Sequence, residues 1–262
     1  LITRLIAPSS GTIVLKGEDL LALPASRMLE MRKTVQLVFQ DPYSSLNPRK
    51  TVMQILSRPL EVHHLAHGWA AKRRQVLHLL RLVGLGMEHV DRYPHEFSGG
   101  QRQRIAIARA VAAEAKLIVL DEPVSALDVS IRAQIMSLLD DLQKRLGVSY
   151  LFIGHDLATV AYLSHRIAVM YLGRIVEVAE SVELCSNPLH PYTKALFAAA
   201  LPSYPDEVKE ELVVTGEVPS ALNPPSGCHF HPRCPMVMDH CPKLDPVLKE
   251  VAPNHWVACH LY

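Results

Sequence analysis

One short run near the middle of the chain has the residue types that bind phosphate groups. In Ser98-Gly99-Gly100-Gln101, the two glycines allow a ligand to approach the backbone closely. A helix is predicted to begin there, and the free N–H groups of its first turn would point at a bound anion. This run is therefore a candidate phosphate site.

Two adjacent carboxylates follow further along the chain. Asp121 and Glu122 come directly after four apolar residues at 117–120, which predict a short strand buried on both faces. In open parallel sheets, ligands bind at the carboxyl ends of the strands. We therefore expect one carboxylate to hold magnesium and the other to act on a water molecule.

The pattern of apolar residues predicts the elements that position these groups. We expect strands at 34–39, 117–120 and 149–153, helices between 51 and 94, at 101–113 and at 131–146, and a hairpin at 166–178. The strand at 149–153 is expected to be buried. The most regular helical stripe consists of Val76, Leu79, Leu80 and Val83. These elements indicate an α/β fold with a mostly parallel sheet, followed by an irregular tail in which prolines interrupt regular structure.

Composition limits the classes of function. The 262 residues include 27 Lys and Arg against 26 Asp and Glu, so the near-neutral charge argues against a nucleic-acid-binding protein. No apolar run reaches the roughly 20 residues that span a bilayer, and no signal peptide is recognisable at the start. Five cysteines in a chain of this length do not indicate a secreted disulfide scaffold. We expect a cytosolic protein docked on a membrane partner.

The motifs together resemble those of the ABC ATPase family, which has a P-loop NTPase-like fold. The resemblance rests on the run 98–101 as signature motif, on residues 121–123 (DEP) as Walker B, and on residues 125–128 (SALD) as D-loop. Gln40 ends a predicted strand as the family's Q-loop glutamine does, and His155 ends another as its switch histidine does. The ligands that the resemblance implies are ATP and Mg²⁺.

The resemblance also implies a role for each site residue. Asp121 would hold magnesium through water, and Glu122 would act as general base on the attacking water. Gln40 would contact the magnesium or that water, and His155 would bond the γ-phosphate. Two such ATPase domains meet head to tail in this family, so Ser98, Gly100 and Gln101 would act on the ATP held by a partner domain. Gly99 and Asp128 are also expected to bind nucleotide.

Two further runs, QDPYSSLNPR at 40–49 and NPLHPYTKAL at 187–196, resemble the second ATP-binding subunit of oligopeptide and dipeptide permeases. This implies an ABC nucleotide-binding domain at 1–180, with a helical subdomain at about 41–112, and a permease-type C-terminal extension at 181–262. The implied partners are a second ATPase subunit in a heterodimer, two transmembrane permease subunits and, indirectly, an extracytoplasmic peptide-binding protein. The implied location is peripheral, on the cytoplasmic side of the inner membrane.

The phosphate loop GxxxxGK[ST] occurs nowhere in the 262 residues. In the family this loop precedes a helix whose end resembles residues 1–6, so we expect it upstream of Leu1, lost by truncation. The alternative is a natural chain without a nucleotide pocket of its own. In either case we expect residues 1–262 alone to be inactive. The alternative functions are a non-catalytic partner that donates only its signature motif, and a soluble ABC ATPase with no role in transport.

Four cysteines gather near the C-terminus. Reduced cysteines in a loop-rich segment are natural metal ligands, for zinc or for an iron–sulfur cluster. Some members of the permease family that this chain resembles carry a [4Fe–4S] cluster in this region, so we favour that cluster. The alternatives are a zinc site, to which His231 or His260 could contribute, and no metal at all. The four residues are Cys228, Cys234, Cys241 and Cys259.

Overall fold

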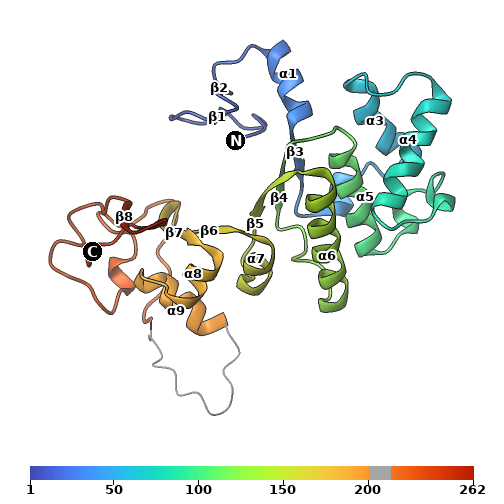
Figure 1. Cartoon of the computed structure of the whole chain (residues 1–262). Coiled ribbons are helices and arrows are strands. Elements are labelled where there is room, and N and C mark those ends of the chain that lie inside the picture. The colour runs from blue at the N-terminus through green and yellow to red at the C-terminus, as the bar shows by residue number, and fades with distance from the viewer. Residues whose placement is uncertain (201–213) are drawn as a thin grey trace. The chain divides into compact units, whose positions relative to one another are not determined.

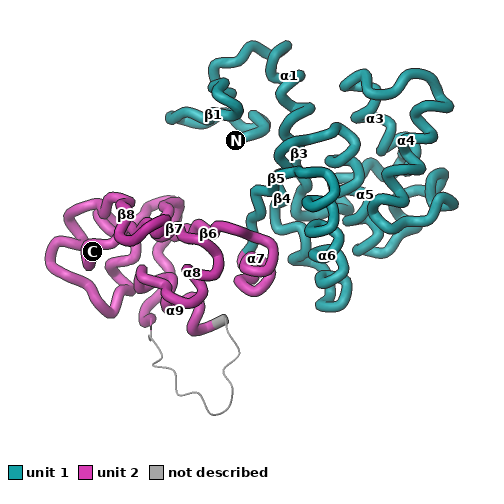
Figure 2. The backbone as a smooth tube through the Cα atoms, in the orientation of Figure 1, with its two compact units in different colours: residues 1–154 teal, residues 155–262 magenta. Residues whose placement is uncertain are grey.

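The structure is a computed structural model that describes residues 1–200 and 214–262. Contacts divide the chain into two compact units, Leu1–Gly154 and His155–Tyr262 (Figure 2). The domain boundary predicted between residues 180 and 181 rests on the family resemblance and not on contacts, and it stays a prediction.

A three-stranded parallel sheet forms the centre of the N-terminal unit (Figure 1). Its order is β3 (Val35–Val38), β4 (Leu117–Asp121) and β5 (Ser149–Ile153), and both pairings are parallel. The middle strand β4 is buried at Ile118, Val119 and Leu120, as its apolar sequence predicts. The sheet therefore places the carboxyl end of β4 between those of its neighbours.

The strand predicted at 149–153 is present, but the prediction that it is buried is wrong. Leu151 is 40% exposed and Ile153 is 46% exposed. The exposed residues Ser149, Leu151 and Ile153 alternate along β5 and so lie on one face of the sheet, and the described residues leave that face of the strand uncovered.

Helices α1 and α5 contact β3 of this sheet, and three helices, α3, α4 and α5, pack on one another. The predicted stripe of α4 is confirmed, because Val76, Leu79, Leu80 and Val83 are all buried. The remaining elements of the unit include two short strands that pair as a hairpin and two 3₁₀ turns. The elements are β1 (Val14–Leu15), β2 (Glu18–Asp19), α1 (Ala25–Thr34), α2 (Pro42–Ser45), α3 (Val52–Val62), α4 (Trp69–Leu82), η1 (Met87–His89), η2 (Pro94–Glu96), α5 (Gly99–Val111) and α6 (Val129–Leu146).

The C-terminal unit is built on an antiparallel sheet of order β6-β7-β9-β8 (Figure 1). The predicted hairpin is present, with its turn at Leu172 (φ 41°) and Gly173 (φ 78°). Strand β9 pairs with β7, so the end of the chain completes the sheet. The elements are α7 (Leu157–Leu163), β6 (Arg166–Tyr171), β7 (Arg174–Glu180), α8 (Ser181–Ser186), α9 (Pro191–Ala200), η3 (His231–Arg233), β8 (Lys249–Ala252) and β9 (His255–Val257).

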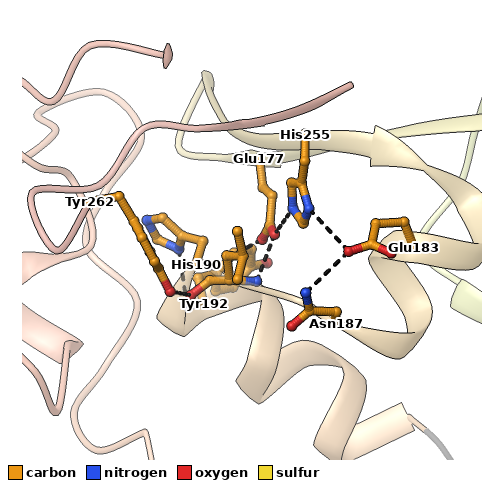
Figure 3. Close-up of polar contacts among 8 residues, drawn as sticks. Glu177, Glu183, Asn187, His190, Tyr192, His255 and Tyr262 are labelled. Atoms are coloured by element: carbon orange, nitrogen blue, oxygen red, sulfur yellow. Dashed lines mark hydrogen bonds and ion pairs between the residues drawn. The ribbon is translucent and has the colours of Figure 1, made fainter. Parts of the chain in front are cut away.

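A buried carboxylate links three segments of this unit (Figure 3). Glu177 of β7 is 0% exposed and accepts hydrogen bonds from the N–H of Leu189 at 2.7 Å and of His190 at 3.0 Å. His255 Nε2 of β9 lies 2.7 Å from its Oε1. Burial lowers the pKa of His190 to about 4. Glu177 thus holds the turn before α9 against the sheet.

No helix in residues 1–200 and 214–262 has both the length and the apolar character needed to cross a membrane.

Candidate functional site

The structure brings Gln40 and Glu122 together, although 82 positions separate them in the chain. Gln40 follows β3 and Glu122 follows β4. Because these strands are parallel neighbours, both side chains lie at the carboxyl ends of the strands. Gln40 Nε2 donates to Glu122 Oε2 at 2.9 Å. Two residues that were predicted separately as site residues therefore form one hydrogen-bonded pair.

The backbone of Glu122 has an unusual conformation. Its φ is 43°, in the left-handed region that side chains other than glycine rarely adopt. Its N–H donates to the carbonyl of Ile153 in β5 at 3.0 Å. Strained backbone that the surroundings fix in place occurs preferentially at functional sites.

The candidate phosphate site is the N-terminus of α5. Ser98 caps this helix reciprocally with Gln101, because Ser98 Oγ accepts from the N–H of Gln101 at 3.3 Å and Gln101 Oε1 accepts from the N–H of Ser98 at 3.0 Å. The N–H groups of Gly99 and Gly100 belong to the first turn, where they have no intrahelical acceptor. This arrangement can bind an anion.

Gly100 is required by close packing as well. A Cβ at this position would lie 2.4 Å from Ile131 Cγ2 in α6, whereas a Cβ at Gly99 would lie at an ordinary 3.5 Å from Leu127 Cδ2. The predicted signature turn therefore packs against the first turn of the helix that follows Asp128.

We expect Gly100→Ala to lower the free energy of unfolding by about 1–3 kcal/mol, because the new methyl group overpacks the contact with Ile131. Urea denaturation followed by circular dichroism would measure this. Gly99→Ala is the matched control and should change stability by no more than about 0.5 kcal/mol. In an Ile131→Ala background, Gly100→Ala should lose most of its effect. Equal losses for the two glycine variants would contradict the packing argument.

The remaining predicted residues lie as follows. Asp121 ends β4, is half-buried and pairs with Ile153 in the β-sheet register. Asp128 caps α6 by accepting from the N–H of Ile131 at 2.9 Å, and this hydrogen bond holds the pKa of Asp128 below its usual value. His155 is exposed and begins the C-terminal unit. The role of each in nucleotide chemistry stays a prediction.

Sequence reasoning missed two arginines of α5 that hold the segment after Gln40. Arg109 is partly buried, which lowers its pKa, and its Nη1 donates to the carbonyl of Ser45 at 2.6 Å. The guanidinium of Arg102 lies 5.3 Å from the ring centroid of Tyr43. The two arginines are seven residues apart and so lie near one face of the helix, which is the signal that could have identified them.

The four C-terminal cysteines lie in one region of the C-terminal unit. Cys228 and Cys241 are buried, and the N–H of Cys228 donates to the carbonyl of Cys241 at 2.8 Å. Burial raises the pKa of the Cys228 thiol to about 11, with smaller contributions from Cys259, Cys241 and Cys234. Among the described residues, no group of three or more His, Cys, Asp or Glu side chains is arranged to hold a metal ion. The predicted iron–sulfur cluster, like the zinc alternative, stays a prediction.

Comparison with known proteins decides the family. A model described as "ABC transporter" matches residues 1–125, and one described as "Oligopeptide/dipeptide transporter, C-terminal region" matches residues 176–241. The "Oligopeptide transport ATP-binding protein AppF" of Bacillus subtilis (strain 168) is 48% identical over 262 residues, which cover 99% of this chain and 79% of AppF. The chain belongs to the ABC transporter family. A second relative, the "Probable peptide ABC transporter ATP-binding protein y4tS" of Sinorhizobium fredii, is 50% identical over 100% of this chain and 74% of its own length.

Solved structures of other ABC proteins agree with this assignment. The ATP-binding cassette MJ0796, in a dimeric post-hydrolysis state bound to ADP and Pi, is 26% identical and has a TM-score of 0.61 over 69% of this chain and 77% of its own. CbiO1 from Clostridium perfringens, part of the ABC transporter complex cbiONQ, is 27% identical and has a TM-score of 0.62 over 71% of this chain and 72% of its own. The predicted α/β fold class is confirmed. Membership of the ABC family implies ATP and Mg²⁺ as ligands, and the glycine-lined N-terminus of α5 fits a phosphate group.

Proposed function

We propose that this chain is the ATP-binding subunit of an ABC importer of oligopeptides or dipeptides. The observation that carries the proposal is the pair of family matches in one chain, an ABC transporter region followed by the C-terminal region of oligopeptide/dipeptide transporters. The name of the relative AppF, an oligopeptide transport ATP-binding protein, supports the same substrate class.

In this proposal, Glu122 is the general base that takes a proton from the attacking water. Its hydrogen bond with Gln40 supports the assignment, because an amide donor 2.9 Å away fixes one carboxylate oxygen. Magnesium bound at Asp121 would neutralise charge on the phosphate oxygens, and His155 would bond the γ-phosphate. Positioning and electrostatic stabilisation of this kind supply most of the catalysis in phosphoryl transfer.

The signature half of the site serves a partner. Ser98, Gly99, Gly100 and Gln101 would bind the phosphate of ATP held by a second ATPase subunit, and Asp128 would lie at the same boundary. A heterodimer of this kind would dock on two transmembrane permease subunits at the cytoplasmic face of the inner membrane and receive peptides from an extracytoplasmic binding protein. The dimeric state of MJ0796 with ADP and Pi supports the pairing of two ATPase subunits.

Exchange of sequence with AppF tests the transport function. The segment of AppF that matches this chain is replaced by residues 1–262, and the chimera is expressed in a Bacillus subtilis strain without AppF. We expect restored uptake of a labelled oligopeptide, with the Glu122→Gln chimera as the inactive control. A chimera that hydrolyses ATP in membranes but supports no peptide uptake would overturn the proposal.

The polypeptide of residues 1–262 contains no GxxxxGK[ST] run. We propose that this polypeptide alone binds ATP weakly and does not hydrolyse it, because the backbone cradle and the lysine for the β- and γ-phosphates are not among its residues. Micromolar affinity for ATP or measurable turnover would contradict this.

A [4Fe–4S] cluster on Cys228, Cys234, Cys241 and Cys259 belongs to the same proposal, supported by four free cysteines near one another in the C-terminal unit. Anaerobic expression followed by iron and sulfide assay tests it. We expect bound iron to be lost in Cys228→Ser and kept in Cys185→Ser. If the purified protein contains no iron, the cluster proposal is wrong. If it contains stoichiometric zinc instead, the four cysteines form a zinc site.

A further inference from the structure

The N-terminal unit contains a pocket of about 360 Å³ that nucleotide chemistry does not use. It lies where α4 and the end of α5 meet the beginnings of β4 and β5. Leu60, Leu79, Ala112, Ile118 and Val148 form its apolar lining, and each is at most 5% exposed. The volume falls within the range of about 300–1,000 Å³ typical of small-molecule sites.

The pocket is distinct from the candidate ATP site because it lies at the other end of the sheet. Ile118 of β4 lines the pocket, whereas Asp121 lies at the carboxyl end of the same strand, beside the candidate ATP site. Three residues of extended strand span about 10 Å. No residue assigned above to nucleotide chemistry lines the pocket.

The polar side chains that line the pocket, Gln75, His78, Glu114 and Lys116, are all exposed, and Lys116 is a cation. Lys116 is exposed, and its backbone is fixed by two hydrogen bonds, from its N–H to the carbonyl of Thr34 at 2.8 Å and from the N–H of Ser149 to its carbonyl at 2.9 Å. Within residues 1–200 and 214–262, its ammonium forms no ion pair. The rim carboxylate of Glu114 lies instead 3.7 Å from the ammonium of Lys33.

We propose that this pocket binds a small apolar carboxylate. The hydrocarbon part lies against Leu79 and Ile118, and the carboxylate pairs with the ammonium of Lys116. His78 at the rim can donate a further hydrogen bond. Two sources share this chemistry, a medium-chain fatty acid and the C-terminus of a short apolar peptide.

Methyl NMR of the whole chain tests the site, with octanoate and leucyl-leucine as the two carboxylate probes and octylamine as the probe of opposite charge. We expect saturable shifts of the Ile118, Val148 and Leu79 methyl groups with at least one carboxylate at millimolar concentration, and weaker binding of octylamine. The probe that binds more tightly identifies the source. The absence of saturable shifts with both carboxylates, or equal binding of octylamine, would overturn the proposal.

Two variants locate the ligand. Lys116→Glu should weaken carboxylate binding by about tenfold or less, because a solvent-exposed ion pair contributes little to affinity even when one charge is reversed. Lys50→Glu makes the same change of charge at an exposed position that does not line the pocket, and should leave the affinity unchanged. Ala112→Leu should fill the pocket and abolish binding of all three probes. Equal affinities in the two lysine variants would overturn the role of Lys116, even if Ala112→Leu fails to fold.

Discussion

Replacing Glu177 with glutamine is expected to lower the free energy of unfolding of the C-terminal unit by about 3 kcal/mol or more. The carboxylate has no solvent exposure and accepts from the N–H groups of Leu189 and His190 and from His255 Nε2 (Figure 3). Glutamine has the same shape but turns one acceptor oxygen into an NH₂ donor, which would then face donors. A buried donor without an acceptor retains its full desolvation cost.

The chain offers a sharp measurement of this effect. It has two tryptophans, Trp69 in the N-terminal unit and Trp256 beside His255. In a Trp69→Phe background, the fluorescence of Trp256 during urea denaturation reports on the C-terminal unit alone.

Glu183 provides the matched control for Glu177. Its carboxylate lies 3.7 Å from Nδ1 of the same histidine, His255, but its side chain is 48% exposed. Glu183→Gln should therefore cost no more than about 1 kcal/mol. If Glu177→Gln is no more destabilising than Glu183→Gln, the buried carboxylate does not hold the turn before α9 to the sheet.

Features that depend on nearby residues could be predicted from the sequence. The capping box of Ser98 and Gln101 lies within one helical turn, and the burial of β4 follows from an unbroken apolar run. The positions of Gln40 and Glu122 at the carboxyl ends of two strands also followed from the apolar pattern, although the hydrogen bond between them was not predicted. In each case a local pattern or a general rule of sheets determines the outcome.

Features that depend on distant partners could not be predicted. Glu177 reads in the sequence as one polar residue of a hairpin strand, and its partner His255 is 78 positions away. The exposure of Leu151 depends on whether another element covers its face of β5, which the five residues of the strand do not encode. Arg109 likewise has its acceptor, Ser45, 64 positions away.

In the AppF chimera described above, Glu122→Gln is expected to lower the rate of ATP hydrolysis by at least about 100-fold, because a positioned general base contributes about 10²–10⁴-fold. Glutamine keeps the side-chain length, and its amide oxygen can still accept from Gln40 Nε2, so nucleotide binding should change by less than about threefold. Single-turnover hydrolysis and equilibrium binding of a fluorescent ATP analogue would separate the two quantities.

Glu114→Gln is the control that separates the effect of the Glu122 carboxylate from the effect of its unusual backbone conformation. Glu114 belongs to the same unit and also has a positive φ, 57° against 43° for Glu122, but its side chain is 68% exposed and lies near Lys33 rather than Gln40. Removal of this charge should leave hydrolysis within about twofold of the parent chimera, because only groups that reach the reacting atoms lower the barrier. If Glu122→Gln loses hydrolysis and ATP binding in equal proportion, the carboxylate acts in nucleotide binding and another group must accept the proton of the attacking water.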